Sequence, residues 1–423
     1  MRNVFVLGLD PANLQTLYEA ADVPEVAFHP LLSVAELIEA EELPLNELLE
    51  RAEEQLEDAE HSIDAIVGYW DFPVSSMVPI LCERFGLRSA TLEAVLKCEH
   101  KYWSRLEQHA SIEDLPNFAL VDLDDDPPRP DLKYPMWIKP VKAFSSELAF
   151  RVNSEDELRD ALDTIKAGIG RVGEPFQHVL DHAQLPREIT DIGAQACLAE
   201  EAVSGQQVTV EGYKTGPEAE PHIYGIIDSH NYPGTSSFQH YQYPSSLPEH
   251  VQQRLADTSR QVINRIGLDS VAFNIEYFWN SETGAINLLE INPRHSQSHA
   301  ILFELVDGAP NHQCMVRLAL GMDPDLPYRQ GDYAVAAKWF VRRFTDGVVR
   351  SAPSDAELAE LHRSIPGCGV ELLAGEGDRL ANLPEQDPHS FAYATVHVGA
   401  ADEQELAGKY EQAVANLPFE FSE

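Results

Sequence analysis

Two apolar runs joined by a short turn place the strongest limit on how this chain can fold. Residues 272–279 and 285–291 are rich in β-branched, aromatic and aliphatic side chains, and the five residues between them, Asn-Ser-Glu-Thr-Gly, are typical of a turn. Each run also carries one acid, Glu276 in the first and Glu290 in the second. We therefore expect two neighbouring antiparallel strands whose pairing brings these acids together.

Glu276, Glu290 and Asn292 predict a metal site on this hairpin. Alternate residues of a strand point to the same side, so Glu290 and Asn292 share a face, with Glu276 beside them. In the competing interpretation Glu276 faces solvent and Glu290 pairs with Arg294. Two carboxylates among Leu, Ile and Phe are costly without a cation. The two carboxylates and the amide of Asn292 offer only hard oxygen ligands, which Mg²⁺ prefers when it also binds nucleotide phosphates. Mn²⁺ is the alternative ion.

Three positive side chains suit a phosphate-bearing ligand. The chain has only nine lysines, and Lys139 stands near the end of the apolar strand expected over residues 136–140. Lys101 lies on an expected helix, where an ordinary surface lysine is the alternative. A lysine ammonium neutralises phosphate oxygens. Arg294, just after the second acidic strand, would supply positive charge where negative charge develops during phosphoryl transfer and acyl attack.

The start of the chain predicts a small parallel α/β unit. The apolar run 3–8 ends at Gly8 and is followed by a helix-like stretch, and residues 65–68 repeat that signature before another helix. The turn after Leu7 carries a single glycine, so the dinucleotide-binding fingerprint is absent. We interpret this region as a structural unit that precedes the functional one.

Changes of pattern along the chain predict two further units. From about residue 96 the sequence favours an antiparallel sheet with helices, and after residue 320 strand candidates at 334–342, 370–373 and 391–398 precede a closing helix. The predicted division is an N-terminal Rossmann-like unit over 1–95, a central unit over 96–320 with lobes of about 96–195 and 196–320, and a C-terminal α+β unit over 321–423.

The acidic composition describes the surface rather than the chemistry. The 423 residues include 70 acidic and 30 basic ones, a formal charge of −40, and the acids are scattered over the expected helices. We interpret this as adaptation to a salty cytoplasm, and it argues against nucleic acid as a partner. The five cysteines lack metal-site or redox spacing, and no apolar run reaches about 18 residues. We therefore expect a cytoplasmic protein with reduced thiols and no membrane partner.

Five elements follow one another in a set order along the chain. They are Lys101, then Trp137-Ile138-Lys139-Pro140-Val141 with Ser145-Ser146, then Glu200-Glu201-Ala202-Val203-Ser204-Gly205, then Glu276, then Glu290-Ile291-Asn292-Pro293-Arg294. This order resembles the ATP-grasp superfamily over roughly residues 96–320. The resemblance implies the α/β class, with a parallel N-terminal domain, a central two-lobed α+β ATP-grasp domain and a C-terminal α+β domain.

The resemblance also implies roles for single residues. Lys101 and Lys139 would contact the phosphates of ATP, and Arg294 would steady an acyl-phosphate transition state. The hinge whose backbone reads adenine would be Glu200, Glu201, Ala202 and Val203, and magnesium would be held by Glu276, Glu290 and Asn292. The family's phosphate-covering loop is normally rich in glycine, whereas residues 141–148 contain none. Ser145 and Ser146 could still offer hydroxyl and backbone donors to phosphate, and a plain turn is the alternative.

The residues after Arg294 separate the branches of the family. The sequence His295-Ser296-Gln297-Ser298-His299 resembles the biotin carboxylase branch, in which a glutamate four residues after the arginine acts as base. Here that position is Ser298, so we rank ligation above carboxylation. His299 keeps the branch's histidine position and joins Arg294 as a predicted catalytic residue. A zinc site at His295 and His299 would lack a third partner.

The whole pattern is most similar to carboxylate–amine ligases such as the amino-acid and dipeptide ligases. ATP would phosphorylate a small carboxylic acid, an amine would attack the acyl phosphate, and the products would be ADP, phosphate and an amide. Two alternatives stay open: a catalytically silent ATP-binding protein that engages a partner, and a ligase with a thiol or hydroxyl acceptor. Residues 222–243, rich in His and Tyr, either shape the acceptor pocket or form an exposed loop. The resemblance is also compatible with a homodimer.

Overall fold

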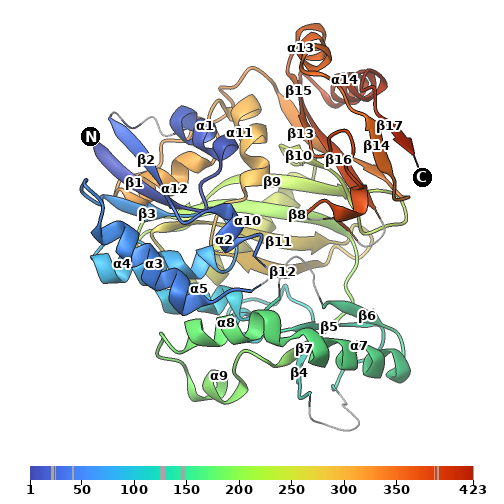
Figure 1. Ribbon diagram of the computed structural model, residues 1–423. Coiled ribbons are helices and arrows are strands. Elements are labelled where there is room, and N and C mark those ends of the chain that lie inside the picture. Colours follow the sequence, from blue (N-terminus) through green and yellow to red (C-terminus); the bar gives the residue numbers. More distant parts are fainter. Residues whose placement is uncertain are drawn as a thin grey trace.

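The computed structural model describes residues 1–20, 23, 25–40, 42–123, 130–143, 148–384, 386–387 and 390–422. It confirms the expected α/β class, with a small parallel sheet, a four-stranded antiparallel sheet and a long antiparallel sheet (Figure 1). No helix in the described ranges has both the length and the apolar character needed to cross a membrane.

The N-terminal sheet is parallel, with strand order β2-β1-β3. Its β1 pairs with β2 on one side and with β3 on the other. The strands and helices of this region are β1 (Arg2–Leu7), α1 (Pro11–Ala20), β2 (Val26–Leu31), α2 (Val34–Leu37), α3 (Leu45–Glu57), β3 (Ala65–Val67), α4 (Val74–Phe85) and α5 (Leu92–Glu99).

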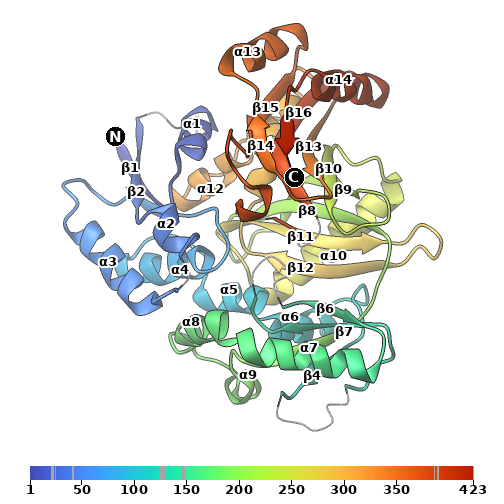
Figure 2. The same cartoon turned by 45° about the vertical axis from the view of Figure 1, so that its right-hand side comes forward.

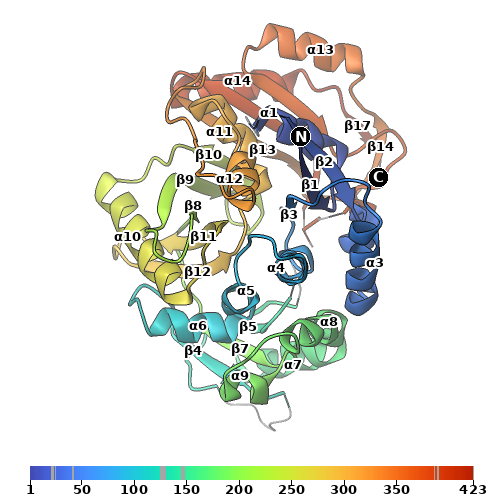
Figure 3. The same cartoon turned by 90° about the vertical axis from the view of Figure 1, so that its left-hand side faces the viewer.

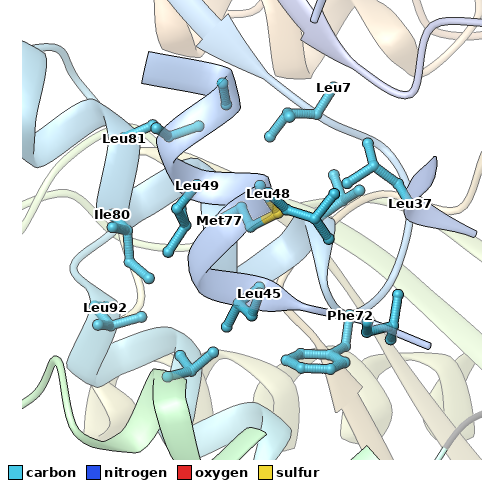
Figure 4. Close-up of a cluster of buried hydrophobic side chains, with 14 of the residues drawn as sticks. Leu7, Leu37, Leu45, Leu48, Leu49, Phe72, Met77, Ile80, Leu81 and Leu92 are labelled. Atoms are coloured by element: carbon cyan, nitrogen blue, oxygen red, sulfur yellow. The ribbon is translucent and has the colours of Figure 1, made fainter. Parts of the chain in front are cut away.

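Leucines at helical spacing bury α3 against α4 and the sheet. The buried positions of α3 recur every three or four residues, at Leu45, Leu48, Leu49, Ala52 and Leu56. Figure 4 shows leucines of α3 beside Met77 and Leu81 of α4, with Leu7 of β1 at the edge of the same cluster. The cluster also includes Phe176 of α8, so the N-terminal region and the next lobe share one core. Figure 3 shows α3 and α8 on the same side of the molecule.

The second sheet is antiparallel, with strand order β4-β7-β5-β6. One face is covered by α7, whose Leu158, Leu162 and Ile165 pack into a core with Met136 and Ile138 of the sheet. The opposite face therefore carries the side chains that alternate with this core. The elements are α6 (Lys101–His109), β4 (Phe118–Val121), β5 (Met136–Pro140), β6 (Phe150–Val152), α7 (Glu155–Gly168), α8 (Gly170–Leu180), α9 (Arg187–Ile192) and β7 (Cys197–Glu201).

The long sheet has eight antiparallel strands in the order β12-β11-β8-β9-β10-β13-β16-β15. They are β8 (Gln206–Lys214), β9 (His222–Asn231), β10 (Phe238–Tyr243), β11 (Val271–Trp279), β12 (Ile286–Asn292), β13 (Val335–Arg343), β15 (Cys368–Leu372) and β16 (Phe391–Ala400). Because β10 pairs with β13, the sheet runs without a break into the C-terminal region (Figure 2). The residue limits of the three predicted units stay a prediction.

Helices cover one side of the long sheet at each end. At one end α10 (Glu249–Ile266) buries Leu255, Val262 and Ile263 against β8, β11 and β12. At the other, α14 (Glu403–Ala415) packs on β13 and β16 through Leu406 and Ala413. The remaining elements are η1 (Gln297–His299), α11 (Ala300–Asp307), α12 (His312–Ala319), β14 (Val348–Ser351), α13 (Asp355–Ser364), η2 (Leu380–Asn382) and β17 (Glu420–Ser422).

Candidate active site

The β11–β12 hairpin places its two acids directly opposite each other. Glu276 pairs with Glu290, and two residues along the strands Asn274 pairs with Asn292. Directly opposite residues of an antiparallel pair point to the same side, so these four polar side chains share one face of the sheet. The other face of β11 carries Ile275 and packs against α10. The structure thus brings Glu276, Glu290 and Asn292 together, as the alternation of the sequence indicates.

The two carboxylates are in different electrostatic states. Burial raises the pKa of Glu276 to about 7, and the negative charge of Glu290 adds to that rise. Partial desolvation also acts to raise the pKa of Glu290, whose side chain is 40% exposed, but Lys101 and Lys139 outweigh it and hold this pKa below its ordinary value. A cation between the two acids would stabilise both in the charged form, so the pair fits a divalent metal.

Asn292 fits the third position of such a site. Its Nδ2 donates to Asn274 Oδ1 at 2.9 Å, and Asn274 Nδ2 donates to the carbonyl oxygen of Arg294 at 3.0 Å. The amide nitrogen of Asn292 is thereby committed, and its carbonyl oxygen is the group that can act as a ligand. Within the described ranges, no three or more His, Cys, Asp or Glu side chains gather as a metal site. The residues that would hold the ion are two carboxylates and one amide.

Lys101 lies on α6 and Lys139 on the four-stranded sheet, whereas the two acids lie on the eight-stranded sheet. Lys101 begins α6, and its Nζ lies 3.4 Å from Glu290 Oε1. Lys139 is the fourth residue of β5, and its Nζ lies 2.5 Å from Glu200 Oε2. Glu290 therefore pairs with Lys101, and not with Arg294 as in the alternative interpretation. A small cavity of about 10 Å³ is lined by both lysines, Glu200 and Glu290.

Glu200 has a role that the sequence did not reveal. Its side chain is buried between two cations, with Oε2 on Lys139 and Oε1 accepting from Arg105 Nε at 2.6 Å. Burial acts to raise the pKa of Glu200, but Arg105 and Lys139 outweigh it and lower this pKa to about 2. Burial in turn lowers the pKa of Lys139, although Glu200 opposes that shift. The carboxylate thus fixes the lysine that is predicted to contact phosphate.

Arg105 is a site residue that sequence reasoning missed. It is 2% exposed and also donates to the carbonyl oxygens of Leu288 and Leu289 in β12, at 2.9 and 2.8 Å. It therefore ties α6 to the strand that carries Glu290. The available signal was its position four residues after Lys101, which places both side chains on one face of the helix.

The rest of the predicted hinge is exposed or bonded through its backbone. Glu201 is exposed and accepts from Asn117 Nδ2 at 2.6 Å, and its own N–H donates to the carbonyl oxygen of Asn117. The N–H of Ala202 donates to the carbonyl oxygen of Pro135 at 3.4 Å. Val203 follows the end of β7. Adenine recognition by this segment stays a prediction.

Arg294 lies on the loop after β12 and His299 ends the short helix η1 that follows, and each contacts an acid. Arg294 forms a two-bond ion pair with Asp71 of the N-terminal region. His299 is buried, with Nδ1 2.9 Å from Oε1 of Glu211, which also accepts from the N–H of Ser296 at 3.1 Å. Neither Asp71 nor Glu211 was predicted from the sequence.

Two other predictions concern segments beside the site. Ser145 and Ser146 lie outside the described residues, so their contribution stays a prediction. Lys142, just before them, is buried, pairs with Glu99 and lies over the ring of Phe72 at 5.2 Å.

The His- and Tyr-rich stretch is mostly sheet rather than an exposed loop. Residues 222–231 and 238–243 form β9 and β10. The interpretation of this stretch as an exposed loop is therefore wrong, because its side chains alternate between the two faces of a central sheet region. The ring of Tyr241 lies 4.9 Å from that of His299.

Comparisons with known proteins identify one domain of this chain and its overall fold. Residues 132–300 match the ATP-grasp domain family. The L-amino acid ligase from Bacillus licheniformis has a similar structure, with a TM-score of 0.71 at 14% sequence identity, covering 100% of this chain and 99% of that one. The N5-carboxyaminoimidazole ribonucleotide synthetase from Thermotoga maritima has a TM-score of 0.65 at 14% identity, covering 99% of each chain. The biotin carboxylase from Campylobacter jejuni has a TM-score of 0.65 at 13% identity, covering 99% of this chain and 92% of that one.

Sequence similarity to curated proteins is confined to a short segment. The large chain of carbamoyl phosphate synthase from Kineococcus radiotolerans is 35% identical over 80 residues, which are 19% of this chain and 7% of that protein. The matched ATP-grasp domain contains Lys139, Glu200, Glu276, Glu290, Asn292 and Arg294, and the whole fold is shared with the ligases above. The chain therefore contains an ATP-grasp domain over residues 132–300.

Proposed function

We propose that this protein is an ATP-dependent carboxylate ligase that forms an amide through an acyl phosphate. The observation that carries the proposal is the facing pair Glu276 and Glu290, with Lys101 3.4 Å from Glu290 and Lys139 lining the same cavity as both Lys101 and Glu290. Two carboxylates that share one face suit a divalent metal, and adjacent ammonium groups suit phosphate oxygens. Together they fit a metal–nucleotide complex better than either group alone.

Each side chain then has a defined task. Lys101 and Lys139 would neutralise phosphate oxygens, and Glu276, Glu290 and Asn292 would hold Mg²⁺, which would further neutralise phosphate charge when bound. Arg294 stabilises the negative charge that develops on the reacting acyl phosphate. His299, whose Nδ1 lies 2.9 Å from Glu211 Oε1, is the second proposed catalytic residue.

The acceptor completes the reaction. Attack by an amine expels phosphate from the acyl phosphate, so the products are an amide, ADP and phosphate. The similar fold of the L-amino acid ligase from Bacillus licheniformis supports an amine acceptor. Small acids and amines are accordingly the proposed substrates.

The proposal is tested by acid-dependent release of ADP and phosphate. Purified protein receives ATP, Mg²⁺ and a mixed set of amino acids and small acids, and products are identified by mass spectrometry. Glu290→Gln removes one of the two proposed carboxylate ligands of the metal. The matched control is Glu282→Gln, because Glu282 is an exposed acid in the turn of the same hairpin. We expect stimulated release in the wild type and in Glu282→Gln, and none in Glu290→Gln. ATP binding of ordinary affinity without stimulated release by any acid would instead favour a silent ATP-binding protein.

A further inference from the structure

Asp71 joins the N-terminal region to the predicted catalytic arginine. Arg294 Nε donates to Asp71 Oδ1 at 2.8 Å, and Arg294 Nη2 donates to Oδ2 at 2.5 Å. This two-bond arrangement is the strongest and most directional pairing between a guanidinium and a carboxylate. The partners are 223 residues apart in sequence. The Asp71 side chain is half exposed. Partial desolvation acts to raise its pKa, but Arg294 outweighs it and lowers this pKa.

The contacts of Arg294 set the direction of its free donors. A third N–H, on Nη1, donates to the carbonyl oxygen of His295 at 3.2 Å. A guanidinium has five N–H donors, so within the part of the chain that the structure describes one N–H on each Nη stays available to a ligand. Asp71 occupies the edge formed by Nε and Nη2. The free N–H of Nη2 therefore points along the edge formed by the two Nη atoms.

Asp71 stands on a tightly built loop. Trp70 Nε1 donates to the carbonyl oxygen of Gly8 at 2.8 Å, and Tyr69 OH donates to Asp10 Oδ2 at 2.8 Å. Gly68 has no room for a side chain, because a Cβ there would lie 2.3 Å from Val74 Cγ1. A carboxylate on such a loop holds its partner in one place.

The same loop also reaches the base of the predicted phosphate-covering segment. Ser75, at the start of α4, donates from Oγ to Glu99 Oε1 at 2.5 Å, and the other oxygen of Glu99 pairs with Lys142. Phe72 lies beneath the ammonium of Lys142. Residues 71–75 thus contact both Arg294 and the pair formed by Glu99 and Lys142.

We infer that Asp71 is a positioning residue of the reaction, through which the N-terminal region fixes Arg294 and aims its two free N–H groups at the reacting acyl phosphate. This inference rests on the proposed ligase function. Asp71 itself does not touch the substrate. Loss of its charge therefore affects turnover more than substrate binding.

A first experiment tests the contact without any assay of activity. Phenylglyoxal modifies arginine, and the rate at Arg294 is followed by mass spectrometry of its peptide in the wild type, Asp71→Asn and Asp58→Asn. Asp58 is an exposed aspartate at the end of α3, so its variant is the matched control. Loss of two charge-assisted bonds should accelerate modification of Arg294 about tenfold in Asp71→Asn, with no change in Asp58→Asn. Equal rates in all three proteins would overturn the inference.

A second experiment separates positioning from binding. We expect Asp71→Asn to lower kcat by about tenfold to a hundredfold with unchanged KM for ATP and for the acid, and Asp71→Glu to recover part of the loss. A raised KM for the acid at unchanged kcat would show that Asp71 binds substrate, and unchanged kinetics would show that Arg294 does not need it. Either result overturns the inference. If the wild type shows no acid-dependent turnover, the ligase proposal fails, while the labelling of Arg294 still decides whether Asp71 fixes it.

Discussion

Replacing Glu200 by glutamine should destabilise the protein and weaken nucleotide binding together. The carboxylate is buried and is bonded to Arg105 at 2.6 Å and to Lys139 at 2.5 Å. In Glu200→Gln the two cations lose their shared negative partner. The amide oxygen can serve only one of them, and the amide nitrogen presents N–H groups to the other.

The magnitude follows from the pKa of Glu200. Its pKa falls from an ordinary 4.5 to about 2. A difference of about 2.5 units corresponds to about 3 kcal/mol of folding stability at neutral pH. This agrees with the roughly 3–5 kcal/mol lost when one member of a buried ion pair is removed.

The pH dependence has a definite sign. Because the pKa is lower in the folded protein, the stabilisation is complete above the unfolded value of 4.5 and is lost as the pH falls towards 2. The wild type should therefore exceed Glu200→Gln by about 3 kcal/mol in free energy of unfolding at pH 7, and by less than half of that at pH 3.

Urea denaturation at both pH values measures this difference, because urea does not screen charges. The control is Glu201→Gln, whose exposed side chain should change the stability by less than about 0.5 kcal/mol. The dissociation constant for ATP should rise about tenfold or more in Glu200→Gln, since Lys139 loses its anchor. A free-energy difference that is absent at pH 7, or equally large at pH 3, would refute the reasoning.

Three further predictions concern the metal, the nucleotide and the surface. Glu276→Gln should raise the Mg²⁺ concentration needed for half-maximal ADP release by about tenfold or more, because one of two charged ligands is lost; an unchanged Mg²⁺ requirement would place the ion elsewhere. Trp137 is 37% exposed and lies two residues before Lys139 in β5, so both side chains point to the same face of the sheet. ATP should therefore change the tryptophan fluorescence of the wild type, and should change that of Trp137→Phe much less. If both proteins respond equally, the bound nucleotide does not reach this face. Finally, the formal charge of −40 predicts a melting temperature that rises between 0.1 M and 1 M KCl, because the Debye length shortens from about 10 Å to about 3 Å and repulsion between the acidic side chains weakens. A constant melting temperature would argue against adaptation to salt.

Local patterns made much of the fold predictable. The strand expected over 136–140 has those bounds in the structure. The first acidic strand begins one residue earlier than expected, and the second begins and ends one residue later. Such strands are visible because apolar and β-branched side chains set them off from the surrounding turns. Alternation within a strand then placed Glu276, Glu290 and Asn292 on one face.

The partners of the site residues were not predictable in the same way. Arg105 meets Glu200 across 95 residues of sequence, and Asp71 meets Arg294 across 223. Neither contact produces a periodic pattern in the sequence, because each depends on how separate sheets and loops pack. Charge alone does not identify a partner among 70 acidic residues. Lys139 and Glu200 differ from these cases, since both lie on paired neighbouring strands.

The continuous sheet limits how this protein can be divided. A chain engineered to stop at residue 320 would lack β13, and the main-chain groups with which β10 now pairs would be missing. The N–H and C=O groups of residues 240–243 would then form an open edge able to accept a strand from another molecule. Such a fragment is therefore expected to self-associate in solution, and a shortened version of the protein would need a polar cap over β10 to remain monomeric.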